Sequence, residues 1–300
     1  LYSMFNKHPK GLIAAALANL GERFGFYTMM AILVLFLQAK FGMNGKEAGF
    51  IYSTFYFSIY ILALVGGIIA DKTRNYKGTI FTGIVLMAVG YLLLAIPSKT
   101  PVDNQTFYLV ITCASLFVIA FGNGLFKGNL QALVGQMYDN PQYANMRDSG
   151  FSLFYMFINI GAIFAPFAAV GVRNWWLSTF GYNYDADLPA LCHGQLAGTL
   201  SPEATETYHT LVTKASTAPV QDYTAFASDY LNVFTTGFHY AFGVAIIAMA
   251  ISLTIYWLNK KNFPDPSKKT VASSASSTVV EMSAQEVKQR MYALFAVFGV

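Results

Sequence analysis

The first long apolar run of the chain, residues 12–38, reads LIAAALANLGERFGFYTMMAILVLFLQ and holds an acid and a base, Glu22 and Arg23, near its middle. A helix that crosses a membrane needs about 20 predominantly apolar residues, and this run is longer than that. Charged side chains inside such a span are costly, so they face protein or water rather than lipid. The run therefore predicts a membrane helix with one polar face.

The rest of the chain has the same character. Hydrophobic residues make up 55% of the sequence and charged residues 11%, whereas soluble domains average about a quarter charged residues. We identify six apolar spans and the start of a seventh, at residues 12–38, 48–70, 79–97, 107–135, 150–172, 232–258 and 287–300. Membrane strands are shorter and alternate in polarity, so these spans predict an all-α integral membrane fold.

The basic residues predict an orientation, because cytoplasmic loops are enriched in Lys and Arg. One set of connections carries Lys7, Lys10, Lys72, Arg74, Lys77, Arg147, Lys260, Lys261, Lys268, Lys269, Lys288 and Arg290, and the other carries Lys40, Lys46, Lys99, Arg173 and Lys214. The first set is richer, which predicts a multi-pass protein of the cell (inner or plasma) membrane with a cytoplasmic N-terminus. The stretch 173–231 is then extracytoplasmic.

We expect three parts along the chain. Residues 1–258 form a six-helix bundle, and the Ser- and Lys-rich stretch 259–286 is a cytoplasmic linker. Residues 287–300 begin a seventh helix. The sequence opens on Leu1 and Val300 falls inside an apolar run, so we expect both ends to be cut and the seventh helix to be truncated.

Several classes of function are disfavoured. Cys113 and Cys192 are the only cysteines, and they suggest neither a disulfide framework nor a metal site. The net charge of +4 does not suggest nucleic acid as a partner. A membrane enzyme such as an acyl or lipid transferase needs a catalytic His or Asp pair near a span end. The four histidines, His8, His193, His209 and His239, lie on no polar helical face. We therefore expect no enzymatic activity, no cofactor and no metal.

Four spans carry polar residues at the i, i+3, i+4 spacing that places side chains on one face of a helix. The four sets are Asn19, Glu22, Arg23, Phe26, Tyr27 and Met30; Tyr52, Tyr56 and Tyr60; Asn123, Lys127 and Gln131; and Ser152, Tyr155 and Asn159. Together they predict a water-accessible cavity lined by aromatic residues, one acid and two bases. A cavity at mid-depth is where secondary transporters bind substrate.

Structural alternatives exist for each group. Glu22 and Arg23 can be a buried pair that only locks helices together. Tyr52 suits the aromatic belt at the membrane interface. Lys127 either snorkels to an interface or needs an acidic partner or an anionic ligand, and Glu22 is the one acid plainly available within the spans.

Four local strings resemble known transporters. Residues 67–74, GIIADKTR, resemble the loop motif of the major facilitator superfamily. Glu22-Arg23-Phe24 followed by Tyr27 resembles the ExxERFxYY motif of the proton-coupled oligopeptide transporters. Residues 122–129, GNGLFKGN, resemble the glycine-rich stretch of that family, which ends KPN, and residues 147–161 resemble its signature on the fifth span. The chain thus resembles the N-terminal half of a proton-coupled oligopeptide transporter.

The resemblance implies two six-helix bundles with the binding cavity between them, the second bundle being absent from this chain. It implies that Tyr27, Tyr60, Lys127 and Asn159 line a peptide site, to which the polar face adds Asn123. Glu22 and Arg23, with Lys127, would serve proton coupling. Asp71 and Arg74 at the end of the second span would suit an inward-side gate. Partners are then small peptides, protons and the lipid bilayer.

The sequence departs from the family pattern at four positions. Asn19 replaces the first motif glutamate, Met30 an arginine that helps grip the peptide carboxylate, Phe26 a tyrosine and Gly128 the proline after Lys127. Two transport hypotheses follow. The first is proton-coupled symport of di- and tripeptides by alternating access. The second keeps the fold but carries another small polar or anionic solute, with altered or absent proton coupling. A receptor or scaffold without transport is a third, separate class.

Overall fold

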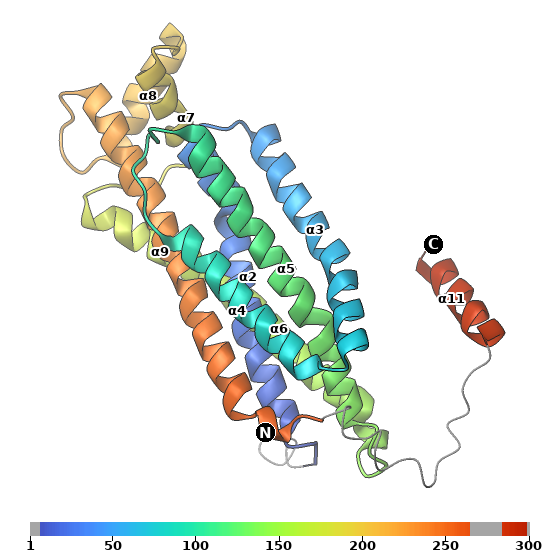
Figure 1. The fold of residues 1–300 in the computed structure, drawn as a ribbon. Coiled ribbons are helices and arrows are strands. Elements are labelled where there is room, and N and C mark those ends of the chain that lie inside the picture. Colours follow the sequence, from blue (N-terminus) through green and yellow to red (C-terminus); the bar gives the residue numbers. More distant parts are fainter. Residues whose placement is uncertain (1–6, 265–283, 299–300) are drawn as a thin grey trace. The chain divides into compact units, whose positions relative to one another are not determined.

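The computed structural model describes residues 7–264 and 284–298, which form two units that we treat separately (Figure 1). The second unit consists of helix α11, Ala284–Phe298. Most of the predicted linker, residues 265–283, lies outside the described residues, as do residues 299–300 of the predicted seventh span. The description below concerns the first unit.

Six long helices make up most of this unit: α2 (Gly11–Phe41), α3 (Gly45–Thr73), α4 (Tyr76–Ala95), α5 (Gln105–Met137), α6 (Arg147–Thr179) and α9 (Tyr223–Leu258). Each is long and apolar enough to cross a membrane. Two 3₁₀ turns, η1 (Ala144–Met146) and η2 (Lys260–Asn262), and two short helices, α7 (Leu188–Ala197) and α8 (Pro202–Ala215), complete it. Among the described residues, the one β-type pairing is an isolated bridge between Tyr182 and Ser216. The predicted all-α membrane fold is confirmed.

Local chemistry fixes where the first helices end. Helix α2 stops at Gly42, whose left-handed φ of 65° suits a residue without a side chain. Asn44 then caps α3 by accepting from the backbone N–H groups of Lys46 and Glu47, and the Glu47 carboxylate accepts in return from the Asn44 N–H group. A reciprocal cap of this kind satisfies donors that the first turn of a helix leaves unpaired.

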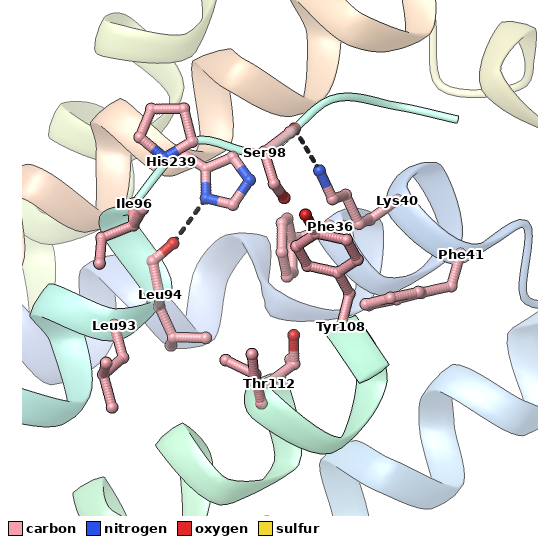
Figure 2. Close-up of a pocket in the computed structure, with 12 residues that line it drawn as sticks. Phe36, Lys40, Phe41, Leu93, Leu94, Ile96, Ser98, Tyr108, Thr112 and His239 are labelled. Carbon is pink, nitrogen blue, oxygen red and sulfur yellow. Dashed lines mark hydrogen bonds between the residues drawn. The ribbon is translucent and has the colours of Figure 1, made fainter. Parts of the chain in front are cut away.

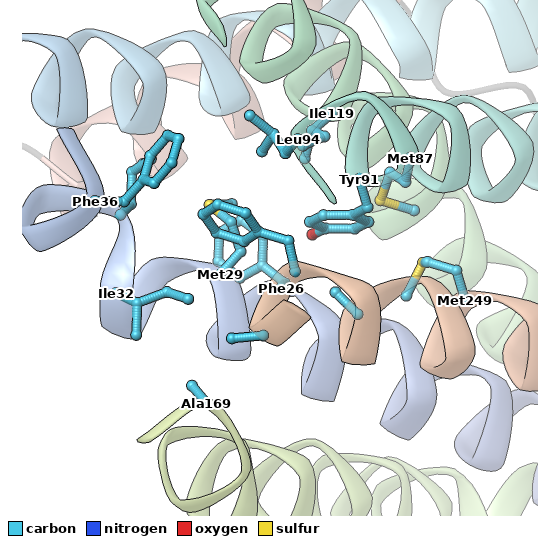
Figure 3. Close-up of a cluster of buried hydrophobic side chains, with 14 of the residues drawn as sticks. Phe26, Met29, Ile32, Phe36, Met87, Tyr91, Leu94, Ile119, Ala169 and Met249 are labelled. Carbon is cyan, nitrogen blue, oxygen red and sulfur yellow. The ribbon is translucent and has the colours of Figure 1, made fainter. Parts of the chain in front are cut away.

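Helix α2 packs against α6 and α9, which also contact each other, while α5 packs against α3 and α4, and α4 also packs against α9. The core includes Phe26 and Met29 of α2 with Met87 and Tyr91 of α4 (Figure 3). Helices α3 and α5 approach closely through glycine: a Cβ added at Gly124 would lie 2.5 Å from the carbonyl oxygen of Leu62. Small residues at a crossing let two membrane helices come together at backbone distance.

The predicted outer stretch 173–231 is partly helical. Helix α6 continues to Thr179 and α9 begins at Tyr223, so the segment between the long helices is 180–222 and contains α7 and α8. This segment packs on the bundle: the ring Nε2 of His193 lies 2.8 Å from the carbonyl oxygen of Ala39. Burial of Cys192 in α7 raises the pKa of its thiol to about 12, because the thiolate would lose its hydration.

Candidate functional site

The centre of the site is a buried ion pair on α2. Arg23 donates from Nε to Glu22 Oε2 at 2.5 Å and from Nη2 to Glu22 Oε1 at 2.6 Å. Asn123 of α5 donates from Nδ2 to Glu22 Oε1 at 2.9 Å. Glu22 is 0% and Arg23 4% exposed. The carboxylate thus accepts three hydrogen bonds in a place that water does not reach, and two of them come from its ion-pair partner Arg23.

A cavity of about 200 Å³ opens in front of this pair. Its walls come from α2, α3 and α5: Arg23, Phe26, Tyr27, Met30, Tyr52, Tyr56, Ile59, Tyr60 and Lys127. Arg23 therefore has two environments, since its guanidinium binds Glu22 on one side and its side chain reaches the cavity on the other. The guanidinium carbon lies 4.8 Å from the Phe26 ring centroid.

Lys127 is the second cation of the cavity and has no carboxylate within ion-pair distance among the described residues. Its Nζ lies 5.7 Å from the centroid of the Tyr60 ring, and the Tyr60 hydroxyl donates to the Tyr56 hydroxyl at 3.1 Å. A cation–π contact of this kind is weak when part of the ring is exposed, and Tyr60 is 51% exposed. The Lys127 ammonium thus lies near an aromatic wall and can still donate hydrogen bonds to a ligand.

The cavity brings together four residues predicted from sequence: Tyr27, Tyr60, Lys127 and Arg23. Glu22 lies one layer behind it. Asn123, predicted to bind substrate, is fully buried and binds Glu22 instead of lining the cavity.

Three other predicted residues lie elsewhere. Asn159 is exposed on α6 and does not line the cavity of this unit. Asp71 accepts a hydrogen bond from the Tyr76 hydroxyl. Arg74 is exposed, with a left-handed φ of 51° between α3 and α4.

The structure also adds residues that the site prediction omitted. The cavity is also lined by Met30, Tyr52 and Tyr56. The i, i+4 spacing of Met30 from Phe26, and of both tyrosines along the helix to Tyr60, places them on the same helical faces as the predicted residues. Tyr91 of α4 is fully buried near Glu22 and Arg23, and its hydroxyl has no hydrogen-bond partner among the described residues. In the sequence, Tyr91 is marked only as the single tyrosine inside the apolar span 79–97.

The chain matches a known protein family. Residues 77–297, most of the chain, match the PTR2 family, which is described as the POT family. This chain belongs to the POT family. The resemblance stated from the sequence strings is therefore confirmed.

Relatives of this POT chain include transporters of bacteria. It is 35% identical over 185 residues to the peptide transporter YePEPT of Yersinia enterocolitica, covering 60% of this chain and 34% of that protein. It is 34% identical to dipeptide and tripeptide permease A of an Enterobacter species, covering 59% and 32%, and 32% identical to the uncharacterized transporter YclF of Bacillus subtilis, covering 65% and 37%. The POT chain spans about a third of the length of these relatives.

Solved structures give the same fold. A peptide transporter POT crystallised with sulfate superposes with a TM-score of 0.57 at 24% identity, covering 97% of this chain and 46% of that one. A POT family transporter in complex with 5-aminolevulinic acid superposes with a TM-score of 0.55 at 25% identity, covering 85% and 39%. The chain is therefore a multi-pass membrane protein that spans about half of the solved transporters.

Proposed function

We propose that the full-length protein carries small peptides across the membrane by alternating access, coupled to protons. The observation that carries this proposal is the cavity with Lys127, an ammonium that has no carboxylate partner among the described residues. A partly buried ammonium without a counter-ion is unfavourable unless an anion arrives. A peptide carboxylate is an anion of suitable charge and geometry.

The other walls of the cavity suit a peptide as well. Tyr27, Tyr56 and Tyr60 offer hydroxyls that donate or accept hydrogen bonds, together with aromatic faces for side chains. A volume of about 200 Å³ corresponds to roughly seven water molecules at ~30 Å³ each, which is room for a small polar solute. The exposed face of Tyr60 leaves this half of the site open on one side.

Proton coupling is proposed to run through Glu22. Its carboxylate is the acid nearest the cavity, and Asn19, which is also buried, cannot titrate. Protonation of Glu22 would weaken both hydrogen bonds from Arg23 and free the guanidinium for the cavity. Proton binding and substrate binding would then be linked through one arginine.

We propose the domain organisation that the spans predict. Residues 1–258 are a six-helix bundle, 259–286 a cytoplasmic linker and 287–300 the beginning of a seventh helix. A second six-helix bundle would supply the other wall of the site, including the surface that meets Asn159. In this arrangement the N-terminus is cytoplasmic, the protein lies in the cell membrane, and Asp71 and Arg74 belong to the inward-side gate.

A second cargo is favoured by one observation. Met30 lines the cavity with an uncharged thioether, where the family pattern has an arginine. With Arg23 engaged by Glu22, the cavity keeps one cation, Lys127, for an anionic group. A single carboxylate on a solute other than a peptide can pair with this one cation. One POT family transporter was crystallised with such a solute, 5-aminolevulinic acid.

The test is uptake by the full-length protein in proteoliposomes with an acidic exterior. We expect saturable dipeptide uptake that Lys127→Ala lowers by about 10- to 100-fold in kcat/KM, the loss expected for one charged hydrogen bond. Lys46→Ala, which removes an exposed lysine at the start of α3, should leave uptake unchanged. Unchanged kinetics in Lys127→Ala would show that this lysine only snorkels. Uptake of 5-aminolevulinic acid without dipeptide uptake would favour the second cargo.

A further inference from the structure

A second cavity lies where α2 and α4 end and α5 begins (Figure 2). Its volume is about 240 Å³. Apolar side chains make most of its wall, including Phe36 and Phe41 of α2 and Leu93 and Ile111 of α4 and α5. It shares no lining residue with the cavity around Lys127.

Two buried basic side chains stand in this apolar wall. Lys40 is 2% exposed, and its Nζ donates to the carbonyl oxygens of Ser98 at 2.5 Å and Lys99 at 3.1 Å. An ammonium has three hydrogens, so one donor remains. No carboxylate lies within ion-pair distance of Lys40 among the described residues. Its positive charge is therefore offset by carbonyl dipoles and by the Tyr108 ring, whose centroid lies 6.0 Å from Nζ.

His239 of α9 is the second basic group and is 4% exposed. Its Nδ1 lies 2.6 Å from the carbonyl oxygen of Leu94, which accepts but cannot donate, so Nδ1 carries the hydrogen. Nε2 is buried and has no hydrogen-bond partner among the described residues. In Figure 2 this second nitrogen lies on the side of the ring that faces Ser98. A buried polar atom without a partner indicates a ligand or an ordered water.

The mouth of the cavity leads onto an apolar stripe. Val89, Leu92, Leu93 and Ile96 follow the i, i+3, i+4, i+7 spacing of one helical face, and they are 44%, 52%, 39% and 56% exposed. Leu93 and Ile96 also line the cavity. On a membrane-spanning helix, an exposed stripe of this kind faces alkyl chains. A molecule with its head in the cavity can therefore lay its chain along α4.

We propose that this cavity binds the headgroup of an anionic phospholipid that carries a free hydroxyl. The remaining Lys40 donor can bind an anionic oxygen, which the positive charge favours, and the Nε2 lone pair of His239 can accept a hydrogen bond from a hydroxyl group. A glycerol phosphodiester headgroup offers both. The cavity is smaller than the ~300–1,000 Å³ typical of sites that enclose a whole drug-sized ligand, which suits a headgroup whose chains stay outside.

The test uses the purified full-length protein in detergent, with lipid adducts counted by native mass spectrometry. The probes share one chain length: phosphatidylglycerol, phosphatidylmethanol, which lacks the hydroxyl, and phosphatidylcholine, which lacks the net charge. Glycerol phosphate without chains is the fourth probe. We expect phosphatidylglycerol to bind at least about tenfold more tightly than phosphatidylcholine, with phosphatidylmethanol between them.

Three variants locate the adduct. Lys40→Met should remove the preference for both anionic lipids, and His239→Phe only the preference for phosphatidylglycerol over phosphatidylmethanol. Leu93→Trp blocks the mouth and leaves both basic side chains in place, so it keeps the proposal testable if Lys40→Met fails to fold. Lys46→Met, an exposed lysine, should change nothing.

Two results would overturn the proposal. Retained phosphatidylglycerol preference in a folded Leu93→Trp or Lys40→Met protein would show that Lys40 and His239 only cap the end of α4. Equal binding of glycerol phosphate without chains would make the cavity a site for free anions rather than for a lipid.

Discussion

Replacing Glu22 with Gln removes the negative charge of the buried ion pair and keeps the length of the side chain. In the structure Arg23 is 4% exposed and donates both of its short hydrogen bonds to Glu22. Glu22→Gln therefore leaves a buried guanidinium opposite a neutral amide. The same substitution mimics a carboxyl group that is protonated and cannot release its proton.

The magnitude follows from the burial of both partners. Breaking a buried ion pair by removing one partner costs about 3–5 kcal/mol of folding free energy, because the other charge is left uncompensated. Arg23→Gln should cost a similar amount, since it leaves the Glu22 carboxylate with Asn123 as its one hydrogen-bond donor. The double variant Glu22→Gln/Arg23→Gln leaves no buried charge in the pair, and we expect it to recover most of the loss.

The assay measures stability and transport on the same three variants of the full-length protein. Unfolding in detergent reports stability, and a double-mutant cycle gives the coupling between the two residues. Uptake driven by a pH gradient is measured beside counterflow exchange in the same vesicles. We expect Glu22→Gln to lose pH-driven uptake and retain exchange. The double variant should regain stability but not pH-driven uptake.

Two outcomes would refute this reasoning. If the double variant regains pH-driven uptake along with stability, the pair only locks helices together and carries no proton. If Glu22→Gln keeps both pH-driven uptake and exchange, the coupling acid lies outside residues 1–300.

Three further predictions concern packing, titration and organisation. Gly124→Ala should destabilise the protein by about 1–3 kcal/mol in the same unfolding assay, because the new Cβ would meet the carbonyl oxygen of Leu62 at 2.5 Å, whereas Gly128→Ala, which meets open space, should not. Cys192 keeps its proton to about pH 12 in the folded state but releases it near pH 9 when unfolded. Its contribution to the free energy of unfolding is therefore full below pH 9 and falls as the pH rises to 12. Cys192→Ala should flatten that part of the plot of stability against pH, and an unchanged slope would contradict the raised pKa of Cys192. Reconstituted residues 1–300 should show no saturable uptake, and saturable uptake would contradict the two-bundle organisation.

The spans and the polar face of the first helix could be predicted because both depend on local order along the chain. A long apolar run forms a helix in lipid wherever its backbone groups must be satisfied internally, so composition and length were enough for α2 to α6 and α9. Helical periodicity likewise placed Arg23 and Tyr27 on one face, and both line the cavity. The short sequence motifs that resemble the POT family are also local, so they could be recognised without the folded structure.

The partners of these side chains were decided by the tertiary structure. Asn123 shares its helical face with Lys127, yet the close crossing of α5 turns Asn123 to the buried Glu22 while Lys127 stays at the cavity beside Tyr60. Lys40, grouped by sequence with loop lysines, is buried beneath the carbonyl groups that follow α4. Hydropathy does not distinguish lipid from protein as the neighbour of an apolar helix face. The register between helices, set by glycine contacts and buried hydrogen bonds, therefore had to come from the folded chain.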